Sequence, residues 1–413
     1  MKNLRKCVVG ESAFFMEAGH MGIYSDYLSM NMQFDSLTKE RKKQLSRISE
    51  LRGGRNIMVY ASAVTKRGDI AIDESDLIPF TDTVSSLDSS KGLDIILETP
   101  GGSAETVEKI VRNLRSKLSD IAVIVPRMAM SAGTIFAMAA NDILMGEISS
   151  LGPIDAQVPF NGRYLPAAAI LDGVKEIMDE VVKNNGKLNP AYIPILQNIN
   201  PGVLKDCQTA QKFSQTLVRQ WLRDYKFSNW TTHNSDNTPV TLKEKESCAK
   251  KIAGALCKHS KWLTHGRSLG IKELTEIGLQ ITDYRNNPDL NDAISRYFIL
   301  LTMTFDQTSI YKIYETPTSQ VIKQSVQSVP MPLPTKRVQN LRPAQDMAQV
   351  EYHCPRCKMS MRIQANLRLG IPILKGYIKF PQNNKIVCPN CGLESDVSII
   401  RMQIESQTRQ KII

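Results

Sequence analysis

A regular alternation of short apolar strands with helices sets narrow limits on the fold of this chain. Residues 94–98, 121–125 and 143–145 are compact runs of strand-forming apolar residues, and helical patterns fill the two intervals between them. Neighbouring parallel strands need a crossover of about a dozen residues or more, which is usually a helix. The alternation therefore predicts an α/β fold, with a parallel sheet that is covered by helices.

Further elements are expected on both sides of this core. A polar helix over 34–52 ends at Gly53-Gly54, a glycine pair that typically stops a helix, and a strand follows over 56–64. Helical patterns cover residues 81–87, 166–184, 203–226, 241–260 and 289–314, and a polar loop lies over 227–240.

The composition changes after residue 315. The segment up to residue 349 is rich in Pro, Gln and Ser and has little periodicity, which is typical of a linker. A chain of 413 residues is long enough for about two or three domains. We expect an N-terminal helical extension over 1–54, an α/β domain over 55–316, a linker over 317–349 and a cysteine module over 350–413.

Two CxxC pairs near the end of the chain, Cys354/Cys357 and Cys388/Cys391, predict a metal site. Four thiolates suit tetrahedral Zn²⁺, and the pattern resembles a zinc ribbon. Eight cysteines in 413 residues are too sparse for a disulfide framework, and a thioredoxin-like CxxC would need a βαβ context that this region lacks. We expect a structural zinc ion on these four cysteines, in a reducing compartment.

The positive charge of the chain is concentrated in the same region, because residues 331–413 carry +8 of the formal net charge of +11. A basic module is able to bind nucleic acid or an acidic protein partner, although a solvated surface gives the same composition. The apolar stretch 121–144 includes Pro126, Arg127 and Asp142, which disfavours a membrane span. No signal peptide is expected at the N-terminus, so the chain is predicted to be cytoplasmic and without a membrane span.

Two turns in the α/β core carry features of acyl-transfer chemistry. Gly101-Gly102, in TPGGS, follows the strand 94–98, and two glycines let backbone N–H groups approach a ligand closely. Ser131, in MSAGT, lies where a strand leads into a helix N-terminus, surrounded by small residues. The N–H of Ala132 and one N–H from the glycine turn would form an oxyanion hole beside the Ser131 hydroxyl.

The strings TPGGS, PRMAMSAGT and SSLGPIDAQV together resemble the serine dehydrogenase proteinase family. That family belongs with the Clp protease proteolytic subunit and signal peptide peptidase A in the ClpP/crotonase superfamily, and the resemblance covers roughly residues 40–316. It implies a β-spiral core and a homo-oligomer. It also implies Ser131 as nucleophile, the N–H groups of Gly102 and Ala132 as oxyanion hole, and a substrate-site loop with Gly101, Gly152 and Asp155.

The proton acceptor for Ser131 is open between two residues. The Clp subunit has a histidine a couple of dozen residues after its serine, whereas this chain has none between Ser131 and Thr232. A Ser–Lys dyad is therefore favoured. Lys175 lies at the edge of the apolar face of the helix over 166–184, where desolvation would lower the pKa of its amine. His265 is the alternative base. Asp155 either orients a base or substrate or caps a turn after Pro153, and the structural role is favoured.

These observations predict a serine-type endopeptidase with Ser131 and Lys175 as catalytic residues, whose zinc ribbon recruits a peptide or protein substrate or a partner. The main alternative is a catalytically silent scaffold whose basic zinc ribbon binds nucleic acid or a protein. An acyl-CoA enzyme of the crotonase type shares the oxyanion-hole chemistry, but a serine at position 131 favours a peptidase.

Overall fold

The computed structural model describes residues 22–413 except 67, 161, 234–235, 326–345 and 409. Contacts divide the chain into two compact units, Met1–Ser325 and Val326–Ile413. Each unit has its own buried apolar core. Among the described helices, none combines the length and the apolar composition that crossing a bilayer requires.

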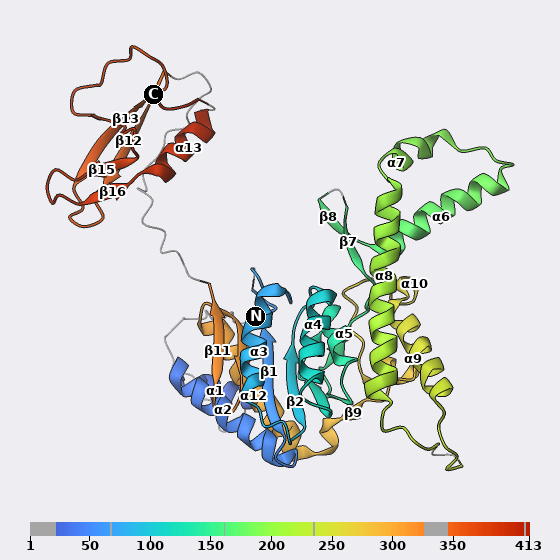
Figure 1. Cartoon of the computed structure of the whole chain (residues 1–413). Helices are drawn as coiled ribbons and strands as arrows, with labels where there is room; N and C mark the ends of the chain where they lie inside the picture. The colour runs from blue at the N-terminus through green and yellow to red at the C-terminus, as the bar shows by residue number, and fades with distance from the viewer. Residues whose placement is uncertain (1–21, 67, 161, 234–235, 326–345, 409) are drawn as a thin grey trace, which may run out of the picture. The chain divides into compact units, whose positions relative to one another are not determined.

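A seven-stranded sheet forms the centre of the first unit, in the order β11-β10-β1-β2-β3-β5-β9 (Figure 1). Five neighbouring strands are parallel: β1 (Asn56–Ser62), β2 (Leu93–Glu98), β3 (Ile121–Val125), β5 (Asp142–Met145) and β9 (Thr282–Asp283). Two antiparallel strands, β10 (Ile310–Glu315) and β11 (Gln320–Gln324), extend the sheet beside β1. The α/β fold class is confirmed, and the spiral arrangement of the core stays a prediction.

Side chains alternate between the two faces of the sheet, as the pleat of a strand requires. Met58 and Tyr60 of β1 belong to one apolar cluster, whereas Ile57 and Val59 belong to another. The helices α3 (Leu77–Ser85), α4 (Ala104–Arg115), α5 (Ala132–Ala137), α8 (Pro201–Trp221) and α9 (Leu242–Cys257) contribute to the first cluster, and α2 (Phe34–Leu51) and α12 (Pro288–Gln307) to the second.

Shorter elements complete the first unit. Next to the sheet are α1 (Ile23–Ser29), the 3-10 turn η1 (Glu74–Asp76), and the short paired strands β4 (Met128–Ala129) and β6 (Ser150–Leu151). The hairpin β7 (Gln157–Phe160) and β8 (Arg163–Pro166) leads into α6 (Ala167–Lys183), η2 (Pro190–Tyr192) and α7 (Ile193–Gln197), which extend away from the sheet (Figure 1). The remaining turns and helices are η3 (Leu222–Lys226), α10 (His259–Trp262), α11 (Ile271–Glu276) and η4 (Tyr284–Asn286).

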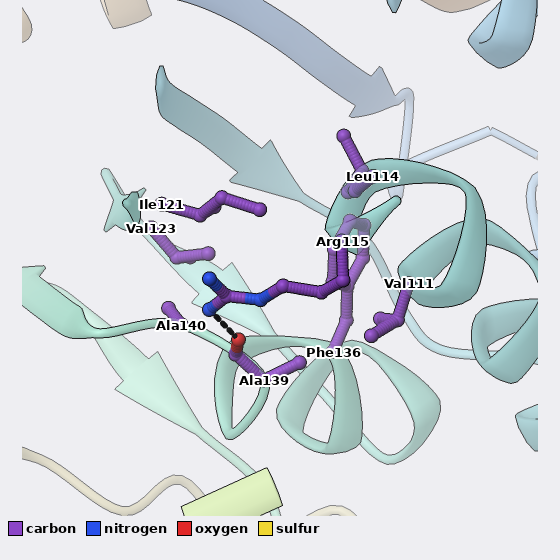
Figure 2. A pocket seen from close by; sticks show the side chains of 8 residues that line it. All are labelled: Val111, Leu114, Arg115, Ile121, Val123, Phe136, Ala139 and Ala140. Carbon is purple, nitrogen blue, oxygen red and sulfur yellow. Dashed lines mark hydrogen bonds between the residues drawn. The ribbon is translucent and has the colours of Figure 1, made fainter. Parts of the chain in front are cut away.

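Arg115 joins the ends of α4 and α5. Its guanidinium lies between the two helices and donates hydrogen bonds to the carbonyl of Ala139 and to Asn141 Oδ1, the latter over 2.9 Å (Figure 2). The apolar gap around it is too small to hold a water molecule. Burial lowers the pKa of Arg115 to about 10, so the group stays charged at neutral pH and fixes the chain that directly follows the short helix α5.

Two expectations for the chain after residue 288 need correction. The helix expected over 289–314 ends at Gln307, and Ile310–Glu315 is a strand. This stretch, IYKIYE, is rich in β-branched and aromatic residues that favour strands, and strand pairing with β1 overrides the helical pattern. Gln320–Gln324, inside the expected linker 317–349, pairs with β10 as β11, and most of the remaining linker lies outside the described residues.

The second unit is a small β-rich module. It contains β12 (Met347–His353), β13 (Ser360–Asn366), β14 (Ile378–Lys379), β15 (Lys385–Val387), β16 (Glu394–Asp396) and α13 (Ser398–Thr408). The strands β12 and β13 are antiparallel, and each CxxC pair lies in a turn that follows β12 or β15.

Candidate active site and metal site

Ser131 lies on a sharp turn between β4 and α5. Its backbone adopts φ 50° and ψ −115°, an uncommon conformation for a residue with a side chain. Serine nucleophiles of hydrolases often lie on such a strained strand-to-helix turn, because it exposes the hydroxyl. Gly133 N–H donates to the Met130 carbonyl over 2.7 Å, and the Ser131 carbonyl accepts from Ile135 N–H over 3.1 Å. The turn is therefore anchored on both sides of the serine.

The glycine turn expected to contribute to the oxyanion hole packs against Ser131. A Cβ atom on Gly101 would lie 2.8 Å from Ser131 Cβ and 2.7 Å from the Met130 carbonyl oxygen, so the two turns are in close contact. Hydrogen bonds of Thr99 to both Met128 and Met130, each of 3.0 Å, hold them together. The structure thus brings together two turns that are separated by almost 30 residues in the sequence.

The N–H groups predicted for the oxyanion hole are not used by the neighbouring backbone pairing. The bridge between Ile72 and the glycine turn uses the carbonyl of Gly101 and the N–H of Ser103, which leaves out the N–H of the exposed Gly102. Ala132 is the first residue of α5, and the first N–H groups of a helix have no partner within it. Both groups are available for a developing negative charge.

The segment from Gly152 to Asp155, which the sequence predicts to be part of a substrate-site loop, lies next to the serine turn. Gly152 N–H donates to Thr134 Oγ1 over 2.8 Å, and a Cβ on Gly152 would lie 3.3 Å from the Ser131 nitrogen. Ser131, Gly102, Ala132 and Asp155 all line one cavity of about 540 Å³. Apolar side chains form much of its wall, namely Ile72, Ile135, Ile154 and Phe213.

Asp155 is buried and holds two histidines. One carboxylate oxygen lies 2.8 Å from His259 Nδ1, and the other lies 2.7 Å from His265 Nδ1. Asp155 is 1% exposed, whereas the two imidazoles are 22% and 29% exposed. His265 is the alternative base expected from the sequence. His259 was not predicted, because no sequence pattern pairs a residue at position 259 with one at position 155.

Lys175, the base favoured from the sequence, is exposed on α6 and is not among the residues that line the cavity. The predicted apolar face of α6 is covered in part, and Ile177 is one of its buried residues. Ala167 and Ile170 are buried, whereas Met178 and Val182 are 63% and 77% exposed. The placement of Lys175 in a single chain therefore gives no support to its role as the base of Ser131.

A buried ionic cluster supports the glycine turn from behind. Asp76 is fully buried and accepts hydrogen bonds from Lys312 Nζ over 2.8 and 2.9 Å, from Lys323 Nζ over 2.8 Å and from Tyr60. Lys312 Nζ also donates to the Ala71 carbonyl over 2.6 Å, directly before Ile72, which pairs with the glycine turn. No sequence motif predicts this cluster, since its members come from four separate segments.

The four cysteines of the second unit form a candidate metal site. Their Sγ atoms all lie within 4.8 Å of one another, with 3.5 Å between Cys354 and Cys391 and 3.6 Å between Cys357 and Cys388. Sulfurs at about 2.3 Å from a tetrahedral zinc ion are about 3.8 Å apart, so the donor set fits such an ion. Hydrogen bonds from the N–H groups of Cys357 and Arg356 lower the pKa of Cys354, which favours the thiolate that binds metal.

Comparisons with known proteins show similarity to a serine proteinase family over part of the chain. Residues 23–189 match the family of ClpP-like SDH-type serine proteinases, a shorter range than the 40–316 expected from the motifs. Two uncharacterized proteins of Methanocaldococcus jannaschii are similar to the chain: one is 32% identical over 164 residues (38% of this chain and 55% of the relative), and the other is 28% identical over 193 residues (46% and 51%).

The chain thus spans about half the length of the curated relatives it matches. A solved structure of a mutant membrane-bound stomatin-specific protease aligns with 54% of this chain and 79% of its own length, with a TM-score of 0.32 and 13% identity. The similarity to ClpP-like serine proteinases covers both turns of the candidate site and Asp155, and it ends before His259 and His265.

Proposed function

We propose that the first unit is a serine peptidase with Ser131 as its nucleophile. The observation that supports this most is the contact between the strained Ser131 turn and the Gly101-Gly102 turn at one cavity. The match of residues 23–189 to a serine proteinase family points to the same reaction class.

The arrangement suits attack on a peptide carbonyl. The Ser131 oxygen would form a bond to the carbonyl carbon, while the carbonyl oxygen becomes negatively charged and accepts hydrogen bonds from the Gly102 and Ala132 N–H groups. Removal of one such donor typically costs about 10²–10³-fold in kcat. The apolar wall with Ile72, Ile135 and Phe213 would hold a side chain of the substrate.

Labelling with a fluorophosphonate probe tests the nucleophile directly, because such probes react with activated serines. The full chain is incubated with the probe, the adduct is mapped by mass spectrometry, and peptide hydrolysis is measured in parallel. We expect an adduct on Ser131 and loss of hydrolysis in Ser131→Ala. A folded wild-type chain that gives no adduct and no hydrolysis favours the catalytically silent scaffold instead.

We further propose that Cys354, Cys357, Cys388 and Cys391 hold a structural zinc ion and that the second unit recruits a substrate or partner. Several basic side chains of this unit are exposed, namely Arg356, Arg362, Lys375 and Lys379. They suit an acidic peptide or nucleic acid. Paired cysteines without disulfides are typical of a reducing compartment such as the cytoplasm, and homo-oligomerisation stays a proposal from the family resemblance.

A further inference from the structure

The cluster of Asp155, His259 and His265 offers a candidate proton acceptor at the cavity that Ser131 lines. A serine hydroxyl needs a group that takes its proton. Asp155 lines the same cavity as Ser131 and accepts hydrogen bonds from the Nδ1 atoms of both imidazoles over 2.8 and 2.7 Å. A ring that binds a carboxylate through Nδ1–H carries its lone pair on Nε2, which is the base in Ser-His-Asp enzymes.

Backbone contacts hold the segment with both histidines against the floor of the site. Ile154 N–H donates to the carbonyl of Leu256, at the end of α9, over 3.1 Å. Leu269 and Leu151 exchange hydrogen bonds of 3.0 and 2.8 Å, and Leu151 also pairs with Ala129 beside the serine turn. Residues 256–269 are therefore docked at both of their ends to the strand and loop that border Ser131.

The turn between the two histidines is strained. Leu263 adopts φ 67° and its side chain is 72% exposed. A residue other than glycine pays about 1–2 kcal/mol for a left-handed conformation, and an exposed leucine gains little burial in return. The bend reverses the chain between position 259 and position 265, so that both rings reach the same carboxylate.

One hydrogen bond to Asp155 would be enough to anchor this segment. Asp155 instead pairs with two imidazoles, and the Nε2 atom of each ring has no role in the anchoring. Within the described part of the chain, Asp155 is the sole hydrogen-bond partner of each of these rings, so both Nε2 atoms are available. The rings are also partly exposed, at 22% and 29%, so both remain open to proton exchange. Neither ring is among the residues that line the cavity, and Asp155 is the residue that connects them to it.

We propose that His259 and His265, positioned by Asp155, form the acid–base centre for Ser131; this inference rests on the proposed peptidase function. One imidazole Nε2 takes the Ser131 Oγ proton, directly or through one water, as Oγ bonds to the carbonyl carbon and the carbonyl π pair moves to oxygen. The same imidazolium returns the proton to the leaving nitrogen when the C–N bond breaks. Water then hydrolyses the acyl-serine, with the imidazole again as base.

Four variants of the full chain separate this proposal from its rivals. Asp155→Asn keeps the shape of the side chain but loses the charge that orients both rings, and we expect kcat to fall about 10²–10⁴-fold with KM within about threefold. We expect a similar fall in the double variant His259→Gln/His265→Gln.

His233→Gln is the matched control, because this histidine pairs with Glu244 on the surface. Lys175→Met tests the lysine, and we expect kcat within about threefold of the wild type.

Chemical rescue distinguishes catalysis from folding. The test uses His259→Gly and His265→Gly. In the variant that lacks the catalytic base, added imidazole should raise the rate of hydrolysis at least tenfold. A structural defect is not repaired by a free base. This measurement decides the matter even where Asp155→Asn fails to fold.

The outcomes are separable from those of the proposed function. The acid–base proposal is overturned if Ser131-dependent hydrolysis persists in all the Asp155 and histidine variants. It is also overturned if hydrolysis is lost in Lys175→Met alone. In both cases the proposed peptidase function stands. A wild-type chain without any Ser131-dependent labelling or hydrolysis overturns both.

Discussion

Ser131 is the residue at which local backbone preference and function conflict. A φ of 50° is costly for serine, and non-glycine residues in such regions pay of the order of 1–3 kcal/mol. The strain persists because hydrogen bonds at Met130, Gly133 and Ile135 fix the turn on both sides. This pattern is expected where a hydroxyl must be presented to a substrate rather than buried.

The strain predicts that Ser131→Gly is more stable than Ser131→Ala. Glycine adopts positive φ without a Cβ clash, so we expect the glycine variant to exceed the alanine variant by about 1 kcal/mol in free energy of unfolding. Both variants should be inactive. Chemical denaturation followed by the fluorescence of the first unit measures the difference, and equal stabilities would show that the turn is not strained.

Gly101 is predicted to be intolerant of a side chain because the serine turn occupies the space. A Cβ there would meet Met130 O at 2.7 Å and Ser131 Cβ at 2.8 Å. We expect Gly101→Ala to lower kcat at least about 10²-fold, because the displaced turn would move the proposed oxyanion donor at Gly102. Gly53→Ala is the matched control: its φ is +75°, but nothing lies within 4 Å. It should lose about 1 kcal/mol of stability and no activity. Comparable activity losses in the two variants would contradict the close packing.

Sequence alone predicted the turns of the site but not its histidine pair. Gly101, Gly102 and Ser131 follow core strands, and parallel strands bring the turns after their carboxyl ends to one edge of the sheet. Asp155 and its partners are 104 and 110 residues apart, and no local pattern encodes such a pairing. Lys175 was chosen from helical periodicity, which assumed that the whole apolar face of α6 would be covered.

At the scale of elements, strands made of fully buried apolar residues were easier to predict than strands that depend on pairing with distant segments. The residues of β2 and β3 are fully or almost fully buried throughout, so their composition is diagnostic. The strands β10 and β11 are stabilised by pairing with each other and with β1. The helical periodicity continues past Gln307 and does not predict these strands, because pairing across the sheet is a non-local interaction.

The Asp76 cluster joins η1, β1, β10 and β11, and it should make the first unit sensitive to acid. Burial alone would raise the pKa of Asp76, but hydrogen bonds from Lys312, Lys323 and Tyr314 outweigh it and lower the pKa below the ordinary value. A depressed carboxyl pKa stabilises the fold above the pKa of the unfolded chain, about 3.9. That stability is lost as the pH falls through the lower pKa of the folded state.

We therefore expect the free energy of unfolding of the wild type to decline more steeply below about pH 4 than that of Asp76→Asn. At pH 7 the variant should be about 3–5 kcal/mol less stable, because the buried Lys312 loses its 2.8 Å ion pair with Asp76. It keeps only the longer contact of 3.7 Å with the partly exposed Asp73. Denaturant titrations at a series of pH values measure both effects. Asp172→Asn, an exposed carboxylate on α6, is the control and should follow the wild type. Parallel pH curves for all three proteins would rule out a role of Asp76 in acid sensitivity.

At the scale of the whole molecule, the chain combines two units that are stabilised in different ways. The first has a large apolar core on both faces of its sheet. The second has a small core that includes the cysteines themselves. A module of this size gains only marginal stability from burial, so metal binding should supply much of its folding free energy. The CxxC spacing predicted this candidate metal site because the two cysteines of each pair are close in the sequence. The partners of a long-range ion pair are not.

Loss of one ligand should therefore unfold the second unit and leave the first intact. In Cys388→Ser we expect the bound zinc to fall from about one per chain to a small fraction, since tetrahedral sites need all four ligands. Limited proteolysis should then cleave within 347–413 and spare the first unit. Hydrolysis of a short peptide at Ser131 should persist, while recruitment of larger substrates is lost. Cys248→Ser, a free thiol of α9 outside the cluster, is the control. Protection of 347–413 in metal-free Cys388→Ser would mean that the apolar core alone folds this unit.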